Sequence, residues 1–106
     1  MLTIEAIQTA ANQIVAAAHA PVKVILFGSY ARGDANAGSD LDFLVVEQNI
    51  PDPVHEYLKL HRAASGFGAG VDILLLTESE FEKKRHWWTT PVYAATREGK
   101  VLYARP

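Results

Sequence analysis

The sequence contains no cysteine, which excludes a disulfide framework and any zinc site built on thiolates. It also lacks an apolar run long enough to cross a bilayer. The first residues carry Glu5 and no cationic flank, which is not the pattern of a signal peptide. The net charge is only −2, so no overall basic field attracts nucleic acid. We therefore expect a cytoplasmic protein with neither a membrane nor a nucleic acid as its partner.

The composition is that of an ordinary globular domain. Hydrophobic residues make up 49% and charged residues 21% of the 106 residues, and this length is close to the commonest size of one domain. The chain shows no repeat, low-complexity tract or linker. We therefore expect residues 1–106 to form a single domain.

The most informative stretch, residues 22–46, begins with an apolar run that ends at a Gly-Ser pair. Residues 22–27 are mostly β-branched or aromatic and predict a buried strand. Gly28 permits a sharp turn and the close approach of a ligand. Ser29 is placed to cap the short turn at residues 30–33. The free N–H groups of such a turn form a ready anion site.

Two aspartates open the next predicted strand, residues 40–46. Asp40 and Asp42 are two residues apart, so their side chains lie on one face of the strand. Neighbouring carboxylates repel each other, and a divalent cation between them removes the penalty. The alternative is a solvated strand entry, where Asp serves as a turn residue. The Gly-Ser turn ten residues upstream favours a site for a metal and a nucleotide.

The remaining elements alternate between helices and strands. We expect a helix from a Thr3 cap to about His19, helices over residues 53–65, 78–88 and 91–98, and strands over residues 71–76 and 100–104. Residues 47–52 are expected to form a polar connection. This order predicts an α/β or α+β domain with one mixed sheet and helices mainly on one face.

Three further positions leave two interpretations each. Asp72 lies either at the wet end of its strand or beside Asp40 and Asp42 as a third carboxylate. Arg32 either pairs with a neighbouring acid or helps to hold a phosphate. Trp87 and Trp88 either stack on a ligand or, as we expect, divide between the core and an interface.

The pattern Gly28-Ser29, ten residues, then Asp40-Leu41-Asp42 resembles the signature of nucleotidyltransferases of the DNA polymerase β superfamily. Residues 28–33 and 39–42, Gly-Ser-Tyr-Ala-Arg-Gly and Ser-Asp-Leu-Asp, look most like the minimal nucleotidyltransferases, the MNT proteins. Many of these are encoded beside a helical HEPN protein and act as its antitoxin. The resemblance implies a fold like the palm of polymerase β.

The resemblance also implies a site. Asp40, Asp42 and Asp72 would be catalytic and would bind two Mg²⁺ ions. Nucleotide contacts would come from four residues of the motif: Gly28, Ser29, Arg32 and Ser39. ATP would donate AMP to a hydroxyl group, that of a tyrosine of a HEPN toxin, within an oligomer or hetero-complex. Two alternatives remain, namely a non-catalytic antitoxin that occludes its partner and a transferase for small molecules that needs a second chain.

Overall fold

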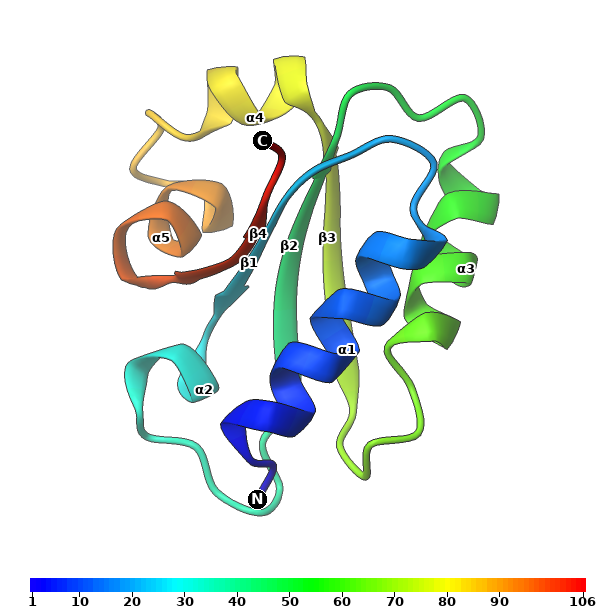
Figure 1. Ribbon diagram of the computed structural model, residues 1–106. Helices are drawn as coiled ribbons and strands as arrows, with labels where there is room; N and C mark the ends of the chain where they lie inside the picture. The colour runs from blue at the N-terminus through cyan, green and yellow to red at the C-terminus, as the bar shows by residue number, and fades with distance from the viewer.

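A computed structural model describes all 106 residues and gives a four-stranded sheet with five helices (Figure 1). In chain order the elements are α1 (Ile4–Ala17), β1 (Pro21–Phe27), α2 (Ser29–Arg32), β2 (Leu41–Glu47), α3 (Pro53–Ala63), β3 (Val71–Thr77), α4 (Glu78–Lys84), α5 (Pro91–Glu98) and β4 (Lys100–Ala104). None of the helices is long and apolar enough to span a bilayer.

The sheet is mixed, as the order of elements predicts. Its strand order is β3-β2-β1-β4. The β2–β3 pair is parallel, while β1 is antiparallel to both β2 and β4. β2 therefore lies inside the sheet, and residues 43–47 of this strand are all buried. That burial explains why the second half of β2 reads as a continuous apolar run rather than an alternating one.

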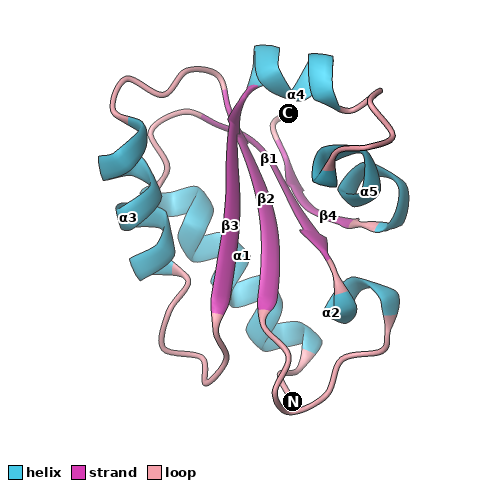
Figure 2. Ribbon diagram, turned by 180° about the vertical axis from the view of Figure 1, so that it is seen from behind, coloured by secondary structure: helices cyan, strands magenta, loops and turns pink.

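The helices divide between the two faces of the sheet. The two longest, α1 and α3, pack on one face over Leu41, Phe43 and Val45. On the other face, α4 and α5 pack over Leu44 and Val46. Figures 1 and 2 show the sheet between these two groups of helices. The expectation of helices on one face thus holds for the longest two, whereas α4 and α5 add a second, smaller core.

Most of the helix caps predicted from the sequence are present in the structure. The side chains of Thr3, Asp52 and Thr90 accept hydrogen bonds from the first turns of α1, α3 and α5. Thr77 and Glu80 form a reciprocal capping box at α4. α4 nevertheless stops at Lys84, before the predicted end near Trp88. The Thr90 hydroxyl donates to the carbonyls of Lys84 and Trp87 at 3.0 and 2.8 Å, which closes the chain into a turn there.

This early end of α4 leaves both tryptophans outside the core. Trp87 is 57% exposed and Trp88 is 78% exposed. The expectation that the pair contributes to the core is therefore wrong. Both tryptophan side chains belong to the short turn between α4 and α5 and face solvent.

The most unexpected feature of the core is a pair of buried carboxyl groups. Glu47, which the sequence analysis placed in a polar connection, is the last residue of β2 and is fully buried. It lies in the same part of the core as Glu56 of α3, which is only 5% exposed. Glu47 Oε1 accepts a hydrogen bond from the Ala20 N–H at 3.0 Å, while its Oε2 accepts none. When protonated, Glu47 can donate to the Glu56 carboxylate.

The Glu56 carboxylate has more hydrogen-bond and ion-pair partners than that of Glu47. Its carboxylate accepts from the His19 N–H at 2.9 Å and contacts Lys59 Nζ at 3.0 Å. Burial and the hydrogen bond to Glu56 raise the pKa of Glu47 to about 7. Despite burial, which opposes the shift, hydrogen bonds from Glu47, His19 and Lys59 lower the pKa of Glu56 to about 2. Glu47 therefore holds the proton of the pair.

Candidate functional site

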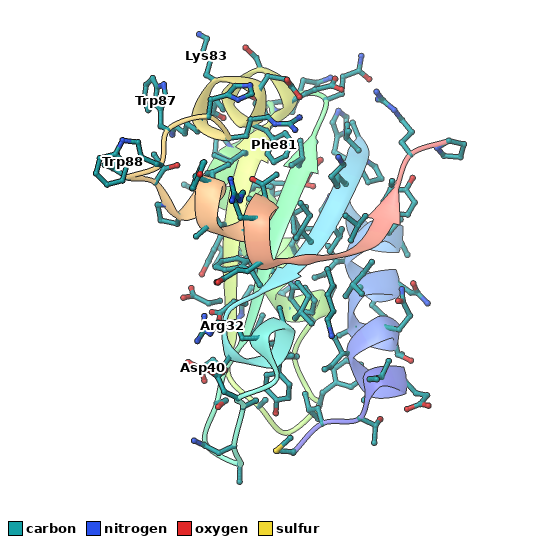
Figure 3. The ribbon with its side chains drawn as sticks, turned by 90° about the vertical axis from the view of Figure 1, so that its left-hand side faces the viewer. Arg32, Asp40, Phe81, Lys83, Trp87 and Trp88 are labelled. Carbon is teal, nitrogen blue, oxygen red and sulfur yellow. The ribbon has the colours of Figure 1, made fainter.

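The predicted site residues meet at one end of the sheet, where β1 ends and β2 and β3 begin. Phe27, the last residue of β1, pairs with Asp42 across the antiparallel ladder. Asp42 in turn lies opposite Asp72 on the parallel neighbour β3. Asp40 directly precedes β2, which begins at Leu41 rather than at Asp40 as expected. In Figure 3, Asp40 and Arg32 lie together at this end of the molecule.

Two glycines make room for the two carboxylates of the Asp-x-Asp pair. A Cβ on Gly28 would overlap the Asp42 carboxylate, and a Cβ on Gly70 would overlap the Asp40 carboxylate. Gly28 also has a φ of 74°, which favours glycine. The Leu41 N–H donates to the Gly70 carbonyl at 2.8 Å and fixes this approach. In the sequence, the only signal for this role of Gly70 is its place directly before the strand that carries Asp72.

The electrostatics of the site favour a cation. Partial burial, followed by the charges of Asp72 and Asp40, raises the pKa of Asp42, and Arg32 opposes this shift. Ionising all the carboxylates together is therefore unfavourable unless positive charge is added. The oxygen donors match the preference of Mg²⁺, which commonly uses one or two carboxylates together with substrate phosphates. No three acidic, histidine or cysteine side chains stand in a ready metal-binding arrangement, so the carboxylates do not form a closed cage.

The Gly-Ser pair begins the short helix α2. The Gly28 carbonyl accepts hydrogen bonds from the N–H groups of Ala31 and Arg32 at 3.1 and 3.0 Å. Gly28, not Ser29, is the N-cap, so the predicted capping role of Ser29 is wrong. Ser29 is the first helical residue, and its N–H and that of Tyr30 precede the first intrahelical bond. These two N–H groups and the Ser29 hydroxyl are available for an anion beside Asp42.

Arg32 pairs with acids in this structure. Its guanidinium contacts Asp34 at 3.3 Å and Glu98 at 3.2 Å, and these hydrogen bonds, that to Asp34 first, raise its pKa. Glu98 is the last residue of α5, so the ion pair connects α2 to that helix. Sequence reasoning could not find Glu98, because 66 positions separate the partners.

Ser39, the remaining predicted nucleotide contact, serves the loop before Asp40. Its hydroxyl accepts a hydrogen bond from the Asn36 N–H at 2.9 Å, and its own N–H donates to the Asn36 carbonyl at 3.0 Å. Ser39 therefore shapes the approach of the chain to Asp40.

Two other conspicuous features lie away from the carboxylates. The largest cavity, about 340 Å³, is lined by residues that include Tyr57, Leu75 and Thr77. Since Thr77 ends β3 and Asp72 is near its beginning, this cavity is at the far end of that strand. Figure 3 likewise shows Trp87 and Trp88 projecting outward at the end opposite Asp40. We therefore assign neither feature to the chemistry of the site.

Comparison with known proteins gives a family and close relatives. A model of the nucleotidyltransferase domain family matches residues 9–101. Two proteins of Methanocaldococcus jannaschii are each named "Putative protein adenylyltransferase". One, MJ0604, is 36% identical over 81 residues, which are 76% of this chain and 77% of that protein. The other, MJ0141, is 43% identical over 53 residues, which are 50% of this chain and 52% of that protein.

Solved structures share the fold at lower sequence identity. A crystal structure of a "putative nucleotidyltransferase" from Sulfolobus solfataricus matches with a TM-score of 0.63 and 24% identity, covering 95% of this chain and 79% of that one. A crystal structure of a toxin–antitoxin with AMP-PNP matches with a TM-score of 0.69 and 20% identity, covering 98% and 75%. At such identities these two likenesses are evidence for the fold alone.

Proposed function

We propose that this chain, which belongs to the nucleotidyltransferase domain family, transfers AMP from ATP to a tyrosine hydroxyl of a helical HEPN partner and thereby acts as its antitoxin. The whole chain would serve as one minimal transfer domain. The observation that carries the proposal is the meeting of Asp40, Asp42 and Asp72 with the Gly28-Ser29 turn at one end of the sheet.

The reaction would be a displacement at the α-phosphorus of ATP. The acceptor oxygen forms a bond to that phosphorus, and the bond to the bridging oxygen of pyrophosphate breaks with its electron pair. Asp72, which is exposed whereas Asp42 is half-buried, would receive the proton of the acceptor hydroxyl. Because phosphoryl transfer needs mainly positioning and charge stabilisation, a small site of this kind would be sufficient.

Magnesium is a cation that suits carboxylate oxygens combined with substrate phosphates. Asp40 and Asp42 would hold it, and Asp72 would complete the shell of a second ion. The bound metal would neutralise phosphate charge and lower the pKa of the acceptor hydroxyl. The space that Gly28 and Gly70 leave around the two carboxylates supports this assignment.

The Gly-Ser turn would hold the leaving phosphates. The N–H groups of Ser29 and Tyr30 and the Ser29 hydroxyl are free of other partners in the first turn of α2. Ser39 would keep Asp40 in place through its loop. Arg32 would hold α2 against α5 through Glu98. It would bind a phosphate only by exchanging its carboxylate partners, Asp34 and Glu98, for it.

Several observations support a protein as the acceptor. The chain is similar over three-quarters of its length to a protein named for adenylyl transfer to protein. A toxin–antitoxin with a bound ATP analogue shares its fold. Trp87 and Trp88 are large, exposed and adjacent, and aromatic residues of this kind are common anchors of protein interfaces. These two residues would dock the partner outside the site.

The test is to co-express the chain with the product of the neighbouring gene and to weigh the partner by intact mass spectrometry. With the wild-type chain, the partner should gain one or more AMP units on tyrosine. With Asp40→Asn and Asp42→Asn combined, the partner should still bind but gain no AMP.

Asp52→Asn supplies a matched control for this experiment. It makes the same chemical change at the cap of α3, where Asn caps as well as Asp. If the Asp52→Asn chain modifies the partner fully, the loss of modification in the double variant is due to the site carboxylates. If the double variant protects cells as well as wild type does, occlusion of the partner is the mechanism and the transferase proposal is wrong.

A further inference from the structure

A second cavity opens directly beside Asp72. It has a volume of about 230 Å³ and is lined by Phe27, Asp72, Ile73, Leu74 and Pro91. Phe27 is the last residue of β1, and Pro91 is the first residue of α5. The cavity therefore lies between the sheet and α5, and one of the three site carboxylates forms part of its wall.

The cavity is on the same face of the sheet as the Asp42 carboxylate. Asp72 and Leu74 are two residues apart on β3 and share a face. Leu74 and Phe27 both pack against the core beneath α4 and α5, the core that also holds Leu44 of β2. Leu44 and Asp42 are again two residues apart. The floor of the cavity thus continues from the carboxylates along the sheet.

In-line displacement determines which substrate reaches this cavity. The attacking and leaving oxygens stand on opposite sides of the phosphorus. If the leaving phosphates lie at the Gly28-Ser29 turn, the acceptor must approach from the side of Asp72. The cavity extends from Phe27, next to this turn, to Asp72. Its Asp72 end therefore lies on the acceptor side, with a carboxylate at hand for the acceptor proton.

The size and the lining of the cavity limit the kind of acceptor that can bind in it. Pockets for drug-sized ligands span about 300 to 1,000 Å³, so a cavity of about 230 Å³ suits one ring better than a whole nucleotide. Four of its five lining residues are apolar, and the fifth is Asp72. Such a wall complements a flat apolar group that carries one hydroxyl. An aliphatic hydroxyl of serine or of a sugar would leave the apolar walls without contacts.

We infer that this cavity is the acceptor subsite, in which Phe27, Leu74 and Pro91 hold the aromatic ring of a tyrosyl side chain with its hydroxyl at Asp72. The inference rests on the proposed function and adds the residues that select a phenol as the acceptor. In the transfer step the phenol oxygen bonds to the α-phosphorus, its proton passes to Asp72, and pyrophosphate leaves with the electrons of the broken bond.

The experiment uses two esters of AMP, one with phenol and one with methanol, as probes of the acceptor subsite. Their affinities for the full chain with Mg²⁺ are measured by calorimetry. For wild type, the phenyl ester should bind about tenfold more tightly than the methyl ester, since packing of an aromatic ring against apolar and aromatic side chains is worth up to roughly that much. Leu74→Phe should abolish this preference by occupying the space of the ring, while the methyl ester binds as before.

Leu75→Phe is the matched control. It makes the same substitution at the next residue of β3, whose side chain lines the remote cavity on the other face. This variant should keep the preference for the phenyl ester. Pro91→Ala removes an apolar wall at an exposed helix position and should reduce the preference without loss of folding, which thermal unfolding checks.

The outcomes separate the inference from the proposed function. Equal affinity of wild type for the two esters would overturn the subsite while leaving adenylate binding intact. If Leu74→Phe weakens both esters equally, the cavity holds the adenosine moiety, and the inference is again wrong. If wild type binds neither ester, the proposed function fails, and the inference falls with it.

Discussion

Replacement of Glu47 by Gln should stabilise the protein at alkaline pH and leave it almost unchanged in mild acid. Glu47 is fully buried and accepts one hydrogen bond, from the Ala20 N–H, while its second carboxyl oxygen accepts none. Burial and the neighbouring Glu56 raise its pKa from 4.5 to about 7. Gln reproduces the protonated carboxyl, because it accepts from the Ala20 N–H and can donate to the Glu56 carboxylate.

The direction of this pH dependence follows from the number of protons that the folded and unfolded chains bind. Between pH 4.5 and 7 the folded chain retains a proton on Glu47 that the unfolded chain has lost. The free energy of unfolding therefore falls as the pH rises through this interval. The raised pKa corresponds to about 3 kcal/mol, fully present below pH 4.5 and lost above pH 7. Glu56 acts in the opposite sense at lower pH, because its contribution is lost as the pH falls from 4.5 to about 2.

The assay is urea unfolding of wild type and Glu47→Gln at a series of pH values from 4.5 to 8. The difference in unfolding free energy should grow by about 3 kcal/mol in favour of the variant over this range. Glu82→Gln, an exposed position on α4, should follow wild type throughout. Glu56→Gln should destabilise at neutral pH, because it removes the charged partner of Lys59. A pH-independent difference for Glu47→Gln would refute the assignment of the proton to Glu47.

Three further predictions concern the candidate site. Asp42→Asn should lower transfer activity by about 100-fold or more in an assay with labelled ATP. It should also raise the melting temperature of the metal-free chain at neutral pH, because the raised pKa of Asp42 shows that its ionised form is unfavourable. An unchanged melting temperature would contradict that reasoning. Ser29→Ala should reduce catalytic efficiency by about ten- to a hundredfold, through loss of a charge-assisted hydrogen bond; an unchanged rate would make Ser29 a turn residue only. Gly70→Ala should displace the Asp40 carboxylate and lower transfer activity by up to about 100-fold. The control Gly38→Ala, where the added methyl has room, should retain wild-type activity in the same assay.

Much of the fold could be predicted from local sequence because its elements carry strong local signals. Thr3, Asp52 and Thr90 mark the starts of three helices, and each side chain caps as expected. The closing strand, Lys100–Ala104, has the predicted bounds. These features depend on residues within a few positions of one another, and a single sequence displays them directly.

The pairing of the site residues across strands could not be predicted from the spacing of the motif alone. Spacing alone put Asp40 and Asp42 on one face, but it gave no register between strands. Parallel pairing of β2 with β3 then set Asp72 opposite Asp42, and antiparallel pairing set Phe27, and hence the Gly-Ser turn, on the other side. The family resemblance supplied this juxtaposition as an implication, and the ladder supplies its physical cause.

What the sequence could not disclose depends on contacts between distant segments. Glu98 meets Arg32 only because α5 returns across β1 after 66 positions. Glu47 looks like a solvated residue at a strand end until α3 covers it and brings Glu56 beside it. Pro91 has an obvious local role as the first residue of α5, and its place opposite Asp72 arises from the packing of that helix over the sheet. In each case a residue with an ordinary local explanation gains a second set of contacts from tertiary structure. The candidate carboxylates can therefore be predicted from a motif, whereas the groups that we propose surround the acceptor cannot.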